Sequence, residues 1–90
     1  MLPFSEQVID HVKIRTFKSS VETEELVWHR DARDRNVLIV SGTGWYFQHD
    51  DCLPIELSPG MSLEIKKNTW HRVIRRDHCS DLVVEIKELD

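Results

Sequence analysis

The sequence predicts an all-β protein in which short strands form a sandwich or a closed barrel. Two observations support this fold class: several short segments alternate apolar and polar residues, and turn-forming residues separate them. Alternation with a period of two places successive side chains on opposite faces of a sheet. About eight such segments at close spacing are typical of sandwiches and barrels. A chain of 90 residues has room for one core, so we expect a single domain over residues 1–90.

The predicted strands follow one another with turns between them. They cover residues 11–17, 26–29, 37–40, 45–48, 53–57, 61–65, 71–74 and 82–86. We expect the β-branched run 37–40 to be buried on both faces of its sheet. Pro54 places the segment 53–57 at a sheet edge, because proline cannot donate a ladder hydrogen bond. The charge-rich segment 20–35 has an alternative interpretation, a helix that begins near Thr23.

Composition and charge exclude several classes of partner. The net charge of −4 does not favour nucleic-acid binding, because neutralising phosphates requires an excess of Lys and Arg. The longest apolar run, Val37 to Val40, is far too short to span a membrane, and the N-terminus lacks the pattern of a secretory signal. We therefore expect a cytoplasmic protein that binds neither nucleic acid nor membranes, with Cys52 and Cys79 as free thiols. Small barrels gain burial by pairing, so we also expect a homodimer.

One segment carries a recognisable spacing of turn residues and a histidine. Gly60 is followed by five residues, then Lys66, one residue, Asn68, two residues and His71. This spacing resembles the downstream motif of the cupin superfamily, in which proline and glycine usually stand where Lys66 and Asn68 stand here. Asn tolerates a positive φ better than most residues do. The tight turn of the motif can therefore form at Asn68.

A second segment resembles the upstream cupin motif in its spacing. His29 aligns with the first histidine of that motif, Asp31 with the second, Arg35 with its glutamate and Gly42 with its glycine. The resemblance covers residues 27–85. It implies a cupin-type double-stranded β-helix, or jelly-roll, barrel with the ligand positions pointing into its mouth. Cupins include dioxygenases, isomerases, epimerases, storage proteins and ligand-binding modules, so the fold leaves the function open.

The residues themselves indicate a metal site, because His29 and Asp31 stand two positions apart. On an extended strand these two side chains point to the same side, and His71 would join them from a distant strand. Two histidines and one carboxylate on one face of a metal leave its other positions open, as in non-haem Fe(II) oxygenases. We therefore predict a divalent transition metal (Fe, Mn, Ni or Zn) at His29, Asp31 and His71.

Arg35 supports two other interpretations of the same residues. Its positive charge opposes a bound cation, and it can simply pair with Asp31. An inward-facing Arg35 would instead suit the pocket to a small anionic or polar ligand, with Gln48 and His49 as further contacts. The function then has three candidates: a metal-dependent enzyme of the oxygenase or isomerase type acting on a small molecule, a non-catalytic ligand-binding module, and an accessory protein that acts through a dimer surface.

Overall fold

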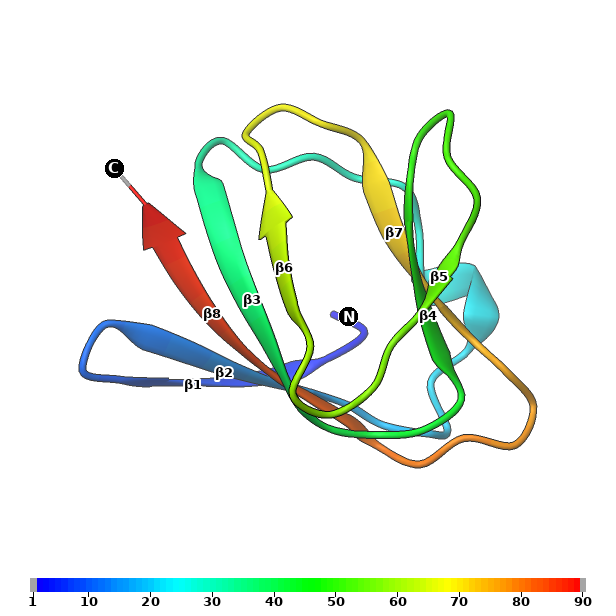
Figure 1. The fold of residues 1–90 in the computed structure, drawn as a ribbon. Helices are drawn as coiled ribbons and strands as arrows, with labels where there is room; N and C mark the ends of the chain where they lie inside the picture. The colour runs from blue at the N-terminus through cyan, green and yellow to red at the C-terminus, as the bar shows by residue number, and fades with distance from the viewer. Residues whose placement is uncertain (1, 90) are drawn as a thin grey trace.

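Eight strands form two antiparallel sheets in the computed structural model, which describes residues 2–89. The strands are β1 (Ser5–Ile9), β2 (Val12–Phe17), β3 (Asp34–Ser41), β4 (Trp45–His49), β5 (Ile55–Glu56), β6 (Ser62–Ile65), β7 (His71–Arg75) and β8 (Leu82–Leu89). The larger sheet has the order β1-β2-β8-β3-β6, and the smaller sheet has the order β5-β4-β7. Figure 1 shows the two sheets facing each other around a common interior, with the β1–β2 hairpin projecting to one side.

The core lies between the two sheets and is built by alternation along the strands. In β3, Val37 and Ile39 are buried, whereas Leu38 and Val40 are exposed. The same alternation continues in β4 and β8. Among residues 2–89, the buried apolar side chains are Phe17, Val21, Val37, Ile39, Trp45, Phe47, Leu57, Ile65, Leu82, Val84 and Ile86. Removing this apolar surface from water is the main force that holds the sheets together.

The predicted all-β jelly-roll fold is confirmed, and most of the predicted strands are present near their expected positions. β5 lies at the edge of the smaller sheet, as Pro54 predicted. Asn68 takes a φ of +61° in the turn between β6 and β7, as the motif requires. The structure thus contains the downstream turn that the sequence spacing predicted.

The prediction that the run 37–40 is buried on both faces was wrong. Leu38 and Val40 are 39% and 44% exposed, because they point to the outer face of the larger sheet. Within residues 2–89, no further layer of secondary structure covers that face. A run of consecutive apolar residues therefore has one face in the core and one face at the surface.

The predicted strand over residues 26–29 was also wrong, because only His29 pairs, through an isolated bridge. The alternative helix in this region is reduced to one 3₁₀ turn, Thr23–Glu25. The segment instead belongs to the loop that links β2 to β3 of the larger sheet, and this loop bridges to β7 of the smaller sheet at His29. No helix in residues 2–89 is long and apolar enough to span a membrane.

The hairpin of β1 and β2 contains a strand that the alternation pattern did not predict. β1 is exposed along its whole length, so it has no buried face to produce a regular alternation. Asp10 and His11 form the turn with φ values of +49° and +68°. Two positive φ values in succession are what a tight two-residue hairpin turn requires.

Candidate metal centre

The two candidate histidines face each other across an antiparallel bridge. The His29 N–H donates to the His71 carbonyl (3.0 Å), and the His71 N–H donates to the His29 carbonyl (2.9 Å). Directly opposed residues of antiparallel strands point to the same face, and the two imidazole rings lie together with centroids 4.3 Å apart. His71 begins β7, whereas His29 lies in the segment that leads to β3. The bridge thus joins the histidines of the two sequence motifs.

Asp31 reaches the same site from two residues beyond His29. Its Oδ2 lies 3.2 Å from Nε2 of His71, and its Oδ1 lies 3.3 Å from Nη1 of Arg35. The turn between β6 and β7 fixes its backbone, because the Asn68 N–H donates to the Asp31 carbonyl at 2.7 Å. The two motif segments therefore hold each other in place at this point.

Backbone carbonyls fix which nitrogen of each histidine is free. Nδ1 of His29 lies 3.0 Å from the Val27 carbonyl oxygen, and Nδ1 of His71 lies 2.9 Å from that of Thr69. A carbonyl oxygen can only accept, so each Nδ1 carries the proton. In the neutral ring, Nε2 then keeps its lone pair. This is the tautomer in which a histidine binds a metal through Nε2.

Burial favours the neutral form of the His71 ring, and the adjacent Oδ2 of Asp31 then lacks a hydrogen-bond donor. Burial lowers the pKa of His71 below its ordinary value, and His29 and His49 add to this effect, against Thr69 and Asp31. The neutral Nε2 and the Asp31 Oδ2 are then two acceptors at 3.2 Å. Oδ2 is buried and has no hydrogen-bond donor. A cation between the two atoms would satisfy both of them.

The separations between the ligand atoms fit one metal ion. Two atoms that each bind an ion at about 2.1 Å lie roughly 3.0–3.4 Å apart at tetrahedral or octahedral angles. Nε2 of His71 and Oδ2 of Asp31 have this separation. With the nitrogen of His29, all three ligand atoms lie within 4.8 Å of one another. Any wider separation involves His29, which is more exposed than His71.

Arg35 is directed inward and forms ion pairs with two carboxylates. It is 9% exposed, and besides Asp31 it contacts Glu88, with Nη2 3.8 Å from Oε2. A hydrogen bond from Lys13, together with the charge of Arg35, holds the pKa of Glu88 below its ordinary value. The pairing with Asp31 and the inward orientation, which the sequence offered as alternatives, are both present. The two carboxylates offset the charge of Arg35 that would oppose a cation.

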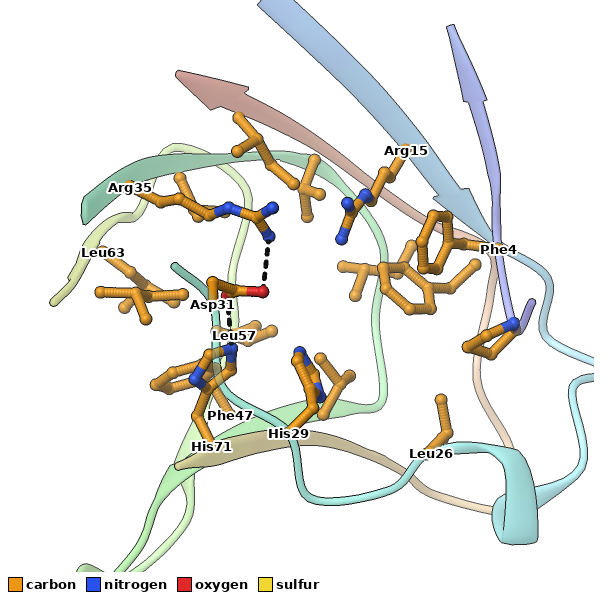
Figure 2. Close-up of a pocket in the computed structure, with 18 of the residues that line it drawn as sticks. Phe4, Arg15, Leu26, His29, Asp31, Arg35, Phe47, Leu57, Leu63 and His71 are labelled. Atoms are coloured by element: carbon orange, nitrogen blue, oxygen red, sulfur yellow. Dashed lines mark ion pairs between the residues drawn. The ribbon is translucent and has the colours of Figure 1, made fainter. Parts of the chain in front are cut away.

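The site opens into a cavity of about 320 Å³ between the sheets. Figure 2 shows Asp31 inside this cavity, with Arg35 on one side of it and the rings of His29 and His71 on the other. The polar side chains of the lining are Arg15, Glu25, His29, Asp31, Arg35 and His71, and the others are apolar. A mainly apolar pocket with a few convergent polar groups is the usual form of a small-molecule site.

Gln48 and His49, which we predicted as further ligand contacts, are not part of the cavity lining. Gln48 lies on the outer face of the smaller sheet, where its Oε1 accepts a hydrogen bond from Nε of Arg72 at 2.9 Å. His49 is the register partner of His71 in the β4–β7 pair. Its ring centroid lies 6.4 Å from that of His71 and 4.8 Å from that of Phe47. His49 therefore lies on β4, next to the candidate ligand His71.

Arg15 and Phe4 are cavity residues that sequence reasoning missed. Arg15 donates from Nε to Glu6 at 2.6 Å, and its guanidinium lies 4.0 Å from the centre of the Phe4 ring. Phe4 in turn packs against Phe17, with ring centroids 5.4 Å apart. One signal was available, because Arg15 stands two positions before the apolar Phe17 in a strand and so shares its inner face.

Solved structures of other proteins have a similar fold. A cupin domain from Bordetella pertussis Tohama I is 22% identical, with a TM-score of 0.65 over 100% of this chain and 98% of its own length. A cupin-like protein from Thermotoga maritima MSB8 is 18% identical, with a TM-score of 0.68, and the match covers 93% of this chain and 65% of that protein. This chain is a small cupin-fold protein.

Enzymes are found among the structures whose fold resembles that of this chain. HppE, in a structure with Fe(II) and its substrate, has a TM-score of 0.69 at 6% identity, over 96% of this chain and 52% of the HppE chain. Neither the scan against protein-family models nor the search of curated proteins gives a match. The similarity thus establishes the fold, and the function has to be argued from the site.

Proposed function

We propose that this cupin is a metal-dependent enzyme, in which His29, Asp31 and His71 hold a divalent transition metal (Fe, Mn, Ni or Zn) at the cavity. One observation carries the proposal: the buried Oδ2 of Asp31 has no hydrogen-bond donor and faces Nε2 of His71 at 3.2 Å. A protonated His71 would also satisfy this oxygen, but burial opposes that protonation. A metal ion satisfies both atoms while His71 stays neutral.

The bound metal would supply Lewis acidity and open coordination positions for the oxygenation or isomerisation of a small molecule. The residues around it have positioning roles. The carbonyls of Val27 and Thr69 orient the two histidine rings, and Arg35 holds Oδ1 of Asp31 so that Oδ2 is left for the ion. The similarity to HppE, which holds Fe(II) with its substrate, supports an enzyme by analogy of fold alone.

Metal analysis of protein purified without an affinity tag tests the proposal. After incubation with Fe(II), Mn(II), Ni(II) or Zn(II) and removal of free metal, we expect about one equivalent of at least one of these ions per chain. Less than about a tenth of an equivalent of every ion would overturn the proposal. Anaerobic handling is required for the Fe(II) sample, because oxidation would otherwise change the ion under study.

Two variants identify the ligands. His71→Ala removes the buried ligand, and Asp31→Asn keeps the shape of the side chain but removes its charge; each should lower metal affinity by about 10-fold or more. His78→Ala is the matched control, since His78 is exposed and lies outside the cavity lining, and it should bind metal like the unchanged protein. Circular dichroism checks that each variant is folded. A folded His71→Ala variant with unchanged affinity would place the metal elsewhere.

A further inference from the structure

The cavity combines a buried and a partly buried arginine with extended apolar walls, and this combination defines a class of ligand. We propose that the ligand of this cavity is a small monocarboxylate with an apolar body, whose carboxylate binds Arg35 on the side of the cavity where Arg15 also lies. The inference rests on the proposed function in one respect, since it names the substrate class of the same site. It needs neither a particular metal nor a particular reaction.

Arg35 supplies the first argument, because part of its guanidinium group lacks an acceptor. The residue is 9% exposed and lines the cavity, and its Nε has no hydrogen-bond partner. Leaving a buried donor unsatisfied costs about 1–3 kcal/mol, and more for a charged group. Asp31 and Glu88 occupy Nη1 and Nη2 at the long separations of 3.3 and 3.8 Å. Nε itself is buried, so a ligand would bind at Nη1 and Nη2, where a carboxylate at ordinary distances adds charge-assisted hydrogen bonds.

Arg15 supplies a second cation on the same wall. It stands opposite Val84 of β8, and Val84 stands opposite Ile39 of β3, so Arg15 shares the inner face of the larger sheet with Arg35. In Figure 2 the guanidinium groups of Arg35 and Arg15 enter the cavity from β3 and β2. Arg15 is held by Glu6 through Nε at 2.6 Å and by the face of Phe4. Its position is therefore fixed before a ligand binds, which lowers the entropic cost of binding.

The apolar part of the cavity lining indicates what kind of group the ligand carries beside its carboxylate. Between the arginines and the opposite wall the cavity is bounded by aliphatic and aromatic side chains, among them Phe47, Leu57, Leu63, Val73 and Leu82. A polar body would lose its hydration there without gaining hydrogen bonds. The volume of about 320 Å³ corresponds to about ten water molecules. We therefore expect a ligand of about ten non-hydrogen atoms with one apolar group.

Charge balance favours a carboxylate over a phosphate. Each arginine already faces an acidic partner: Asp31 and Glu88 contact Arg35, and Glu6 contacts Arg15. Three carboxylates thus face the two arginines, and Glu25 also lines the cavity, so a ligand with one negative charge is repelled less than a ligand with two. A phosphate monoester carries close to two charges at neutral pH. A carboxylate carries one charge, and its planar oxygens match the geometry of a guanidinium group.

The test compares four probes: phenylacetate, its neutral analogue phenylacetamide, acetate, which lacks the ring, and phenyl phosphate, which carries a phosphate in place of the carboxylate. Binding is measured by calorimetry and by NMR titration, on the Zn(II)-loaded protein and on protein stripped of metal. We expect phenylacetate to bind at least about tenfold more tightly than each of the other three. Equal binding of phenylacetamide would show that the site does not recognise the carboxylate. Equal binding of acetate would show that the apolar body adds nothing to binding. Tighter binding of phenyl phosphate would show that the preferred anion is a phosphate.

The metal-free measurement separates Arg35 from the metal, because a carboxylate could bind the ion directly. We expect the preference for phenylacetate over phenylacetamide to persist without metal and to be lost in Arg35→Gln. Arg76→Gln is the matched control: Arg76 is exposed, stacks on Tyr46 and does not line the cavity. If Arg35→Gln does not fold, the comparison of phenylacetate with phenylacetamide on the unchanged, metal-free protein still tests whether the site recognises the carboxylate. A preference that appears only with Zn(II) bound would overturn the role of Arg35.

The failures of the two proposals are distinguishable. A protein that binds a stoichiometric metal and shows no preference for phenylacetate contradicts the ligand class and leaves the proposed function in place. A protein that binds no metal contradicts the proposed function, whatever the probes show. In that case a preference for phenylacetate in the metal-free protein still supports the assignment of Arg35 as the carboxylate contact.

Discussion

The two oxygens of Asp31 differ in what they contact, and this difference defines the site. Oδ1 faces the guanidinium of Arg35, whereas Oδ2 is buried beside a neutral ring nitrogen of His71 and lacks a donor. A carboxylate that served only as the partner of an arginine would gain nothing by placing its other oxygen against a lone pair. The arrangement instead has the form expected of a metal ligand that is oriented by a neighbouring cation.

Asp81 gives a prediction for a single carboxylate far from the site. It accepts a hydrogen bond from the Ser19 N–H at 2.7 Å, and this contact, with the charge of Lys18, holds its pKa below the ordinary value. A carboxyl whose pKa is lowered by folding stabilises the fold above the unfolded-state pKa of about 3.9. That contribution is lost as the pH falls through the lower, folded-state value.

Asp81→Asn should therefore lower the midpoint of urea unfolding at pH 7, and the difference from the unchanged protein should shrink as the pH falls below about 3.9. The asparagine oxygen can still accept from Ser19, so the comparison reports the charge. Asp77→Asn, at an exposed position, is the control for the loss of one negative charge. A difference that is constant from pH 7 to pH 2 would contradict this account.

At the scale of the element, the β6–β7 turn connects backbone conformation to the site. Asn68 adopts a φ of +61°, and its N–H donates to the Asp31 carbonyl at 2.7 Å. A residue with a β-carbon and no local polar group pays about 1–2 kcal/mol for this conformation, whereas glycine does not. We predict that Asn68→Ala lowers the free energy of unfolding by about 1 kcal/mol and weakens metal binding. Asn68→Gly should leave both nearly unchanged, as measured by urea unfolding and metal titration.

β3 gives a second prediction at this scale, because its two faces have different environments. Ile39 is 1% exposed in the core, whereas Leu38 is 39% exposed on the outer face. Ile39→Ala should lower the free energy of unfolding by about 2–5 kcal/mol, since it removes buried contacts and leaves a cavity. Leu38→Ala should cost less than about 1 kcal/mol. Similar costs for both would mean that the outer face is covered in solution, as in the expected homodimer, which stays a prediction.

The strands show what local sequence can and cannot predict. Alternation identified β8, in which every second residue from Leu82 to Ile86 is buried, because burial imposes the period of two. The strand predictions failed for β1, which has no buried face, and for residues 26–29, where a single bridge at His29 replaces a ladder. The prediction that the run 37–40 is buried on both faces was wrong, because apolar residues on an outer face cannot be distinguished in sequence from residues in a core.

At the scale of the whole molecule, the site depends on contacts that the sequence does not contain. Motif spacing singled out His29, Asp31, Arg35 and His71, and the fold does bring them together. The sequence left open whether Arg35 would pair with Asp31 or point inward, because that choice depends on β8, which supplies Glu88 as a second partner. Arg15 lines the cavity because β2 pairs with β8, and this pairing is visible only in the structure.

The proposed metal would tie distant parts of the chain together. His29 and Asp31 lie in the loop before β3, and His71 begins β7 of the smaller sheet. An ion that binds only the folded state adds about 2.7 kcal/mol of stability at a hundredfold excess over its dissociation constant. Each kcal/mol raises the melting temperature of a domain of this size by about 4–8 °C. We therefore predict a rise in melting temperature of about 10 °C or more at this metal concentration, and about half that rise or less in Asp31→Asn.

Hydrogen exchange shows whether the stabilisation arises at the site. The amides of His29 and His71 pair with each other's carbonyls, so a metal between their side chains should slow the exchange of both. The amides of the projecting β1–β2 hairpin serve as the internal control, because β1 is exposed throughout and opens locally without breaking the site. Slower exchange in the hairpin alone, or an equal rise in melting temperature for Asp31→Asn, would show that the ion binds elsewhere on the molecule.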